Sequence, residues 1–201
     1  DYPYYVVTEF DAADERAQEA ALAAFEVGVE RGWISDGVIA QSEAQAAALW
    51  RLREGITESV APRKPYKNDV SVRVSAVPAF LQAMQDLLGR EYPQFEVVWF
   101  GHIGDGNLHI NVLQPDDLDD AAFIAQCEQV TKLLAVTLQQ FGGSISAEHG
   151  IGLVKRPYLQ STRSAVEIAL MRGVRRAFDP QGILNPGKLF APEPAESRFD
   201  L

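Results

Sequence analysis

Two of the three histidines in this chain flank one short turn. They are His102 and His109, in the segment GHIGDGNLHIN, residues 101–111. The dipeptide Asp105-Gly106 is a strong signal for a two-residue type I′ hairpin turn, which would place His102 directly opposite His109. Directly opposed side chains point to the same face of a hairpin, with Cβ atoms about 4.5–5.5 Å apart. Two imidazoles at that separation suit a divalent transition metal such as Zn²⁺ or Mn²⁺, although two hydrogen-bonded histidines on a solvated sheet face would show the same pattern.

The rest of the hairpin predicts a polar face backed by an apolar one. Asn111 stands two residues beyond His109, so it shares the face of the histidines. The other face is apolar and is expected to point toward the core; its residues are Ile103, Leu108, Ile110 and Val112.

The third histidine lies in SAEHGIG, residues 146–152, directly after Glu148. A carboxylate is a common third ligand beside two histidines, and such a site leaves positions open for substrate. Adjacent residues of an extended strand point to opposite faces, so Glu148 and His149 can serve one site only if the backbone turns, which Gly150 and Gly152 permit. A strand-to-loop junction with an exposed charge is the plainer interpretation. Because every histidine lies in one of these two motifs, we favour a functional site, although their spacing does not fix whether they meet in space.

The elements that would position these motifs predict an α+β fold. Residues 69–148 read as strand, helix, strand, strand, helix, strand, which is the ferredoxin-like order: an antiparallel sheet with helices packed on one face. The expected elements are a strand over 69–74, a helix over 78–89, strands over 95–103 and 107–113, a helix over about 117–140 and the strand SISAE at 144–148. An N-terminal βαβα segment, with strands near 4–10 and 36–41, extends this core. A last helix over about 162–178 precedes a C-terminal loop and tail, 179–201.

Composition excludes several classes of protein. The chain has 201 residues, 47% hydrophobic and 23% charged, which suits one large domain or two small ones with a compact core. No apolar run approaches the ~20 residues that span a bilayer. The net charge of −10, without a basic stripe, argues against nucleic acid as a partner. The single cysteine, Cys127, excludes an internal disulfide and favours a reducing, cytoplasmic location.

Two further segments carry polar residues that could bind an anion. Arg53 and Thr57 stand at i and i+4 of an expected helix and so share a face, where Arg53 could hold a carboxylate bidentately. Lys67 comes just before a strand. A solvated surface would explain these residues equally well.

Together, five stretches resemble the C-terminal half of FAD-linked oxidases of the vanillyl-alcohol oxidase superfamily. The similarity is greatest to the group of D-2-hydroxyglutarate and D-lactate dehydrogenases and glycolate oxidase D-subunits. The stretches are ALWRLREGIT, YKNDVSV, WFGHIGDGNLHINV, GGSISAEHGIGLVKRPYL and RRAFDPQGILNPGKLF, in that order from about residue 36 to 190.

The resemblance implies a role for each candidate residue. It makes His149 the general base, and it makes residues 1–201 a substrate- and metal-binding domain with a ferredoxin-like core at 69–148. The implied metal ligands are His102, His109 and Glu148. The implied substrate-binding residues are Arg53, Thr57, Lys67 and Asn111, and Asn185 of LNPGK would approach the flavin.

The implied activity is oxidation of a 2-hydroxy acid to a 2-oxo acid, with proton abstraction assisted by a metal and hydride transfer to FAD. The partners are then a small 2-hydroxy acid, an FAD-binding domain or subunit and an electron acceptor, which could hold the protein at a membrane surface. Because members of this family begin with a separate FAD-binding domain, we expect this chain alone to be inactive. Its exposed apolar surface could also form a homodimer.

Two other functions fit part of the pattern. A self-contained metal hydrolase could use the same metal ligands with His149 as base, but it gives no role to LNPGK or to Arg53 and Lys67. A non-catalytic ferredoxin-like module that binds metal or a partner would need only the hairpin and its core. Hydrolysis with metal alone would favour the first, and metal-dependent self-association without affinity for hydroxy acids the second.

Overall fold

The structure is a computed structural model that describes residues 2, 4–11 and 14–191. Within them the fold is α+β, with seven α-helices and one antiparallel sheet of three strands. The chain divides into two compact units, Asp1–Ser59 and Val60–Leu201. No helix in the described part is long and apolar enough to cross a bilayer. Residues 192–201 of the expected C-terminal loop and tail, 179–201, lie outside the described residues.

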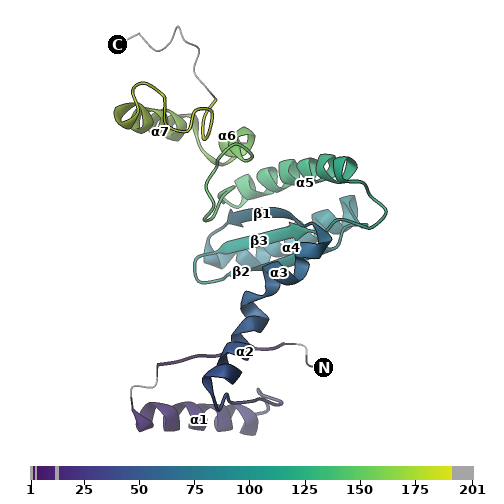
Figure 1. The fold of residues 1–201 in the computed structure, drawn as a ribbon, viewed down its shortest axis with the longest axis vertical. Helices are drawn as coiled ribbons and strands as arrows, with labels where there is room; N and C mark the ends of the chain where they lie inside the picture. The colour runs from purple at the N-terminus through teal and green to yellow at the C-terminus, as the bar shows by residue number, and fades with distance from the viewer. Residues whose placement is uncertain (1, 3, 12–13, 192–201) are drawn as a thin grey trace. The chain divides into compact units, whose positions relative to one another are not determined.

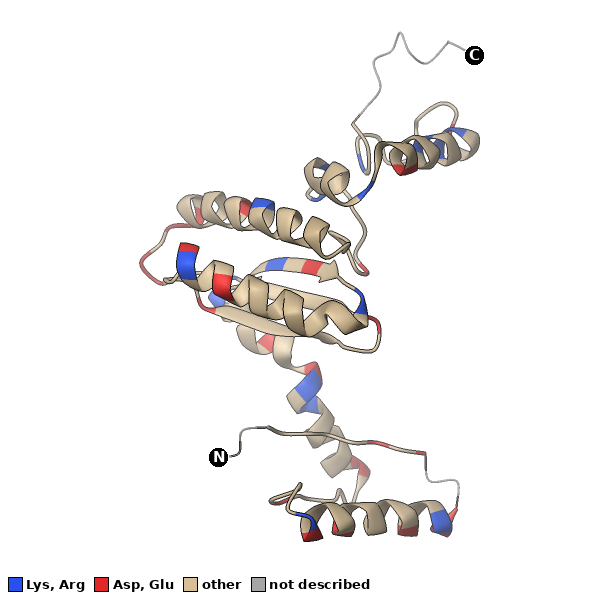
Figure 2. Ribbon diagram, turned by 180° about the vertical axis from the view of Figure 1, so that it is seen from behind, with Lys and Arg blue, Asp and Glu red and all other residues tan. Residues whose placement is uncertain are grey.

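The N-terminal unit is helical. Its helices are α1 (Glu15–Glu30) and α2 (Glu43–Glu54), followed across the unit boundary by α3 (Ile56–Val60). Acidic residues of α1 lie along one face, which is coloured red in Figure 2. The strands predicted near 4–10 and 36–41 are absent, so that prediction was wrong. Tyr4 and Val6 are 86% and 85% exposed. Side chains that favour strands form one only where a second strand supplies ladder hydrogen bonds and packing.

The C-terminal unit contains the sheet. Its strands are β1 (Tyr66–Ser71), β2 (Val97–His102) and β3 (Asn107–Val112), arranged in the antiparallel order β1-β3-β2 (Figure 1). The helices are α4 (Val77–Glu91), α5 (Asp120–Gln140), α6 (Leu159–Thr162) and α7 (Ala165–Phe178). Short 3₁₀ turns are η1 (Ala61–Arg63), η2 (Val74–Ala76) and η3 (Arg156–Tyr158). The last long helix starts at Ala165, later than predicted, because Ser164 and Glu167 form a capping box there.

One face of the sheet is covered by α4 and α5. Helix α4 lies behind the strands in Figure 1 and in front of them in the reverse view of Figure 2. Phe80 and Met84 of α4 and Leu134 of α5 pack with Ile110 of β3 in the core, and all four are inaccessible to solvent. Burial of such side chains stabilises a fold by about 1.5–3 kcal/mol each. The apolar face predicted for the hairpin is confirmed for Leu108, Ile110 and Val112, which all lie in this core.

The hairpin turn differs from the prediction. His102 pairs with Asn107 and His109 pairs with Phe100, so the two histidines are diagonal neighbours, not directly opposed. The two strands are connected by a four-residue loop, 103–106. A type I′ turn would require a positive φ at both Asp105 and Gly106, but of these two only Gly106 has one, at 71°. Ile103, predicted to face the core, stands in this loop and is 62% exposed.

The outer strands are also displaced from the prediction. β1 begins and ends earlier than 69–74, and Val74 falls in η2. The strand expected at 144–148 is reduced to one antiparallel bridge between Ser71 and Ser144. The cause is a competing acceptor: the side chain of Asp69 accepts the backbone N–H groups of Glu148 and His149, which turns the chain away from the sheet.

Gly106 should be the most sensitive position of the hairpin loop. A Cβ atom there would lie 1.9 Å from the carbonyl oxygen of Val72, in addition to the unfavourable positive φ. We expect Gly106→Ala to lower the free energy of unfolding by roughly 1–3 kcal/mol, as measured by urea denaturation. Gly104→Ala is the matched control, because nothing lies within 4 Å of the added Cβ. Equal urea midpoints for the two variants would contradict this account of the loop.

Candidate functional site

The face of the sheet opposite α4 and α5 carries the polar residues, and we call it the polar face. Side chains alternate along each strand, so the residues flanking the core positions share this face. Asp69 of β1 pairs with His109 of β3, and His102 and Asn107 form the next pair toward the loop. The aromatic ring of Phe100 stacks on His109 with their centroids 4.8 Å apart. The predicted sharing of one face by His102, His109 and Asn111 is consistent with this register.

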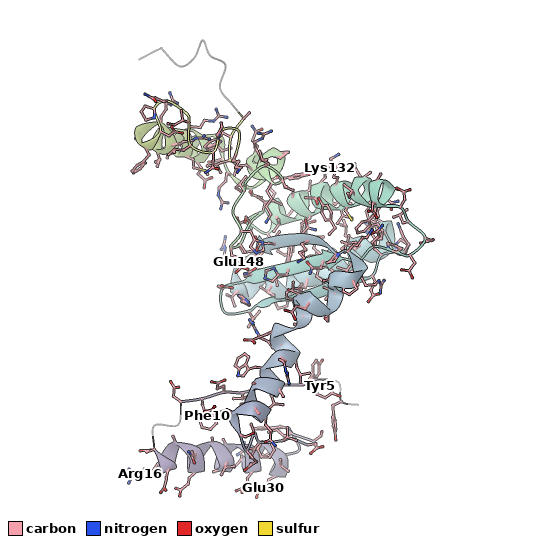
Figure 3. The ribbon with its side chains drawn as sticks, in the orientation of Figure 1. Tyr5, Phe10, Arg16, Glu30, Lys132 and Glu148 are labelled. Carbon is pink, nitrogen blue, oxygen red and sulfur yellow. The ribbon has the colours of Figure 1, made fainter. Side chains whose placement is uncertain are left out.

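The segment containing Glu148 and His149 folds back onto Asp69, so the two histidine motifs meet. The Asp69 carboxylate accepts the Ser146 hydroxyl at 3.1 Å and the His149 backbone N–H at 3.1 Å. It also accepts the Glu148 backbone N–H, at 3.4 Å. The backbone turn that the sequence required is therefore organised by a buried carboxylate of β1. Figure 3 shows Glu148 beside the strands of the sheet.

The Glu148 carboxylate lies at the centre of a polar cluster. Its Oε2 accepts a hydrogen bond from Nδ2 of Asn107 at 3.1 Å, and its Oε1 lies 3.6 Å from Nε2 of His109. The His149 ring stands between two carboxylates, with Nε2 3.4 Å from Glu148 and Nδ1 3.5 Å from Asp69. Glu148 and His149 side chains are 47% and 61% exposed, so this cluster is open to a small molecule.

Three of these residues could hold a metal ion. Ligand atoms of Asp69, His109 and Glu148 all lie within 4.8 Å of one another. Asn107 Oδ1 is buried and has no hydrogen-bond partner among the described residues, so one further oxygen is unsatisfied beside Glu148. Imidazole and carboxylate donors fit a divalent cation. His102 is exposed, with its ring 6.0 Å from that of His109, and its place in the ligand set stays a prediction.

Burial and charge act in opposite directions on the titrating groups of the cluster. Burial lowers the pKa of His109, and the nearby carboxylates of Glu148 and Asp69 offset this only in part. His109 is therefore neutral at pH 7, the form that binds a metal. For Asp69, burial raises the pKa, but the His149 N–H and Lys155 outweigh it and hold the pKa below the ordinary value. The Lys155 ammonium donates to Asp69 Oδ2 at 3.0 Å and to its carbonyl oxygen at 2.7 Å.

These shifts predict two pH windows for the metal-free chain. Because the folded-state pKa of His109 lies below its ordinary 6.5, the unfolded chain takes up the proton first, and stability is expected to fall as the pH drops below about 6.5. The folded-state pKa of Asp69 is also lowered, from 3.8, so its stabilisation is present above that pH and is lost below it. Urea midpoints measured from pH 8 to pH 3 test this. His109→Gln should remove part of the upper slope and leave the lower one; an unchanged upper slope would contradict the prediction.

The other predicted site residues lie on different elements of the chain. Asn111 is buried on β3, where it pairs with Lys67 of β1. Lys67 also lines an open pocket of about 440 Å³ together with Lys64, Asp120 and Phe123. Arg53 and Thr57 belong to the N-terminal unit, on either side of the Gly55 junction between α2 and α3, so their part in the site stays a prediction.

Asn185 lies in a loop that is well anchored by hydrogen bonds. It has a positive φ of 44°, and its side chain accepts from Lys188 at 3.2 Å. Arg175 donates to the carbonyl oxygens of Leu184 and Lys188, at 3.0 Å each. The loop is thus a defined surface, and its contact with a flavin stays a prediction.

Sequence reasoning missed three members of the cluster: Asp69, Asn107 and Lys155. Alternation could have found the first two, because Val70 and Val72 in the core put Asp69 on the polar face, and Asn107 stands two residues before His109. Lys155 gave no such signal. It is separated from Asp69 by 86 residues and lies just before η3, outside any strand.

Residues 1–189 match the family described as FAD linked oxidases, C-terminal domain. The chain belongs to this family, as its resemblance in sequence motifs indicated.

The chain is also similar to individual dehydrogenases. The chain is 70% identical to a D-2-hydroxyglutarate dehydrogenase of Xanthomonas citri pv. viticola, over 94% of this chain and 40% of that relative. It is 53% identical to a D-2-hydroxyglutarate dehydrogenase of Stutzerimonas stutzeri, over 95% of this chain and 41% of that relative. It is 34% identical to a D-lactate dehydrogenase of Anaerostipes hadrus, over 92% of this chain and 39% of that relative. The chain therefore spans about two fifths of the length of these relatives.

Proposed function

We propose that this chain is the substrate- and metal-binding part of an FAD-dependent D-2-hydroxy-acid dehydrogenase, with D-2-hydroxyglutarate as the substrate. The observation that carries the proposal is the meeting of His109, Glu148 and His149 on one open polar face. Membership of the FAD-linked oxidase family and 70% identity to a D-2-hydroxyglutarate dehydrogenase support the flavin and the substrate.

We interpret residues 69–148 as a ferredoxin-like core whose fourth strand is reduced to a bridge. The bridge of Ser144 to Ser71 lies on the side of β1 away from β3, which gives the order fourth segment, β1, β3, β2. All three pairings are antiparallel, as that arrangement requires. In this interpretation residues 1–201 form one functional domain, and 179–201 form its C-terminal loop and tail.

His102, His109 and Glu148 would hold the divalent cation, Zn²⁺ or Mn²⁺. When bound, the cation would lower the pKa of the substrate hydroxyl, and FAD would accept the hydride. His149 takes the hydroxyl proton, and its ring lies between two carboxylates that orient it. Loss of this proton to His149, together with loss of the Cα hydride that bound FAD would accept, would convert the 2-hydroxy acid into a 2-oxo acid.

Cationic and polar side chains would select a dicarboxylate. Arg53, Thr57 and Lys67 would hold the substrate carboxylate, and Asn111 would lie near the substrate and the metal. Positive side chains are needed because the chain carries a net charge of −10, which repels an anionic substrate. Asn185, on its anchored loop, approaches the flavin from this chain's side.

The proposed partners are an FAD-binding domain or subunit and an electron acceptor. The acceptor could hold the enzyme at a membrane surface, and a homodimer could cover exposed apolar side chains. The single cysteine, Cys127, is buried and unpaired with another cysteine, consistent with a reducing compartment such as the cytoplasm.

Isothermal titration of the metal-stripped chain tests the proposal. We expect one Zn²⁺ or Mn²⁺ per chain, and binding of D-2-hydroxyglutarate only when metal is present. The double variant His102→Ala/His109→Ala should bind neither the metal nor the hydroxy acid. The control variant Glu128→Gln, which removes an exposed carboxylate on α5, should bind both ligands. The single variant His102→Ala decides whether His102 is a ligand. Hydroxy acid binding that is independent of metal would contradict the proposed mechanism.

A further inference from the structure

We propose that Asp69 and Lys155 form a positioning pair that holds Glu148 and His149 in their working orientation, and that Asp69 is not itself a metal ligand. This inference rests on the proposed function, because it assigns a role to two residues behind that site. The pair is a side-chain ion bridge between β1 and the residue that precedes η3.

Asp69 has the environment of an internal anchor. Its side chain is 3% exposed, and that of Lys155 is 16% exposed. The carboxylate accepts from a hydroxyl, from two backbone N–H groups and from an ammonium group. Removal of one partner from such a buried pair leaves an uncompensated charge, which is strongly destabilising. The pair is therefore expected to act as a unit.

The segment held by this pair has little regular structure of its own. Between the Ser144 bridge and η3 no helix or strand is present. A functional site nevertheless needs its side chains held to within about 0.5 Å. Ser144 fixes one end, through backbone hydrogen bonds to Ser71 at 3.0 and 2.7 Å. Lys155 fixes the other end by binding both the carbonyl and the carboxylate of Asp69. The Asp69 carboxylate fixes the middle.

The same contacts argue against Asp69 as a ligand, although its distance to His109 and Glu148 would permit it. Oδ2 of Asp69 already accepts from Ser146, His149 and Lys155. Oδ1 accepts the Glu148 backbone N–H at 3.4 Å. A carboxylate oxygen offers about two lone pairs, so no acceptor position is left on Oδ2. A cation bound there would also face the Lys155 ammonium, only 3.0 Å from the same oxygen. Among the described residues, the ion pairs of Glu148 are with His109 and His149, and neither is a lysine or arginine.

Metal titration of four variants tests the pair. Changes to groups that orient metal ligands weaken metal affinity by about 10–100-fold, and we expect this for Asp69→Asn and for Lys155→Met. The double variant should be no weaker than the weaker single variant, because the two residues act together. Lys155→Arg, which keeps the cation, should recover most of the affinity. If Asp69 were a ligand, Lys155→Met would instead bind metal more tightly, because a competing positive charge is gone; that result would overturn the proposal.

The absorption spectrum of bound Co²⁺ separates positioning from ligation. Asp69→Asn saturated with Co²⁺ should give the wild-type spectrum, since the ligand set is unchanged, whereas Glu148→Gln should not. A spectrum altered in Asp69→Asn as in Glu148→Gln would overturn the proposal.

Amide hydrogen exchange tests the pair without any metal. Exchange of the Glu148 and His149 amides should rise at least tenfold in Asp69→Asn and Lys155→Met, while the β2–β3 ladder stays protected and shows that the variants are folded. Unchanged exchange would overturn the positioning role. If wild-type protein binds no metal, the proposed function fails in its metal part, and hydrogen exchange still decides the role of the pair.

Discussion

Under the proposed function, replacement of His149 by alanine is expected to lower the turnover of D-2-hydroxyglutarate by about 10²–10⁴-fold, the usual contribution of a general base. The measurement is kcat in the flavin-loaded enzyme that contains this chain. The His149 side chain is 61% exposed, and its two ring nitrogens face different carboxylates. Such a ring is held in place and can still reach a substrate proton.

Metal affinity separates this role from ligation. Because His149 is expected to take a proton and not to bind the cation, His149→Ala should keep the affinity of the chain for Zn²⁺ within a few-fold. KM for the hydroxy acid should also change little, since substrate is held by other groups. A loss of metal affinity as large as that of a ligand variant would make His149 a ligand and would remove it as the base. Unchanged kcat would exclude it from the chemistry.

The polar face could be predicted from the sequence because its cause is local. A strand places every second side chain on the same face, so GHIGDGNLHIN was sufficient to separate His109 and Asn111 from the core residues Leu108 and Ile110. The same period does not fix which residues are opposed. Register depends on loop length, and here the loop is set by Gly106, whose carbonyl accepts the Val72 N–H from a distant segment.

The role of Asp69 could not be predicted from the sequence in this way. A single aspartate in a strand gives no sign that it will bind the backbone N–H groups of Glu148 and His149, which lie 79 and 80 residues further along the chain. The same contacts explain the missing fourth strand, because N–H groups that bind a carboxylate are lost to the sheet ladder. In both cases a long-range hydrogen bond to one buried side chain decides between two locally acceptable structures.

Replacement of Glu148 by glutamine is expected to weaken metal binding more than replacement of either positioning residue, Asp69 or Lys155. Groups that merely orient a ligand are worth about 10–100-fold in affinity, so loss of a ligating carboxylate should exceed about 100-fold. Glutamine keeps an oxygen that can accept from Asn107 but loses the charge that faces His109 and His149. Titration with Zn²⁺ measures the loss.

The order of the two variants should be reversed for stability: Glu148→Gln should lower the free energy of unfolding less than Asp69→Asn. The Glu148 side chain is 47% exposed, so its charge is largely solvated, and Glu148→Gln should change the free energy of unfolding of the metal-free chain by no more than about 0.5 kcal/mol. Asp69→Asn, which disrupts a buried pair, should cost several times more. Glu128→Gln should change neither quantity. A Glu148→Gln variant that still binds Zn²⁺ with wild-type affinity would remove Glu148 from the ligand set, and with it the metal-assisted mechanism, because His109 would be left as the sole well-placed ligand predicted from sequence.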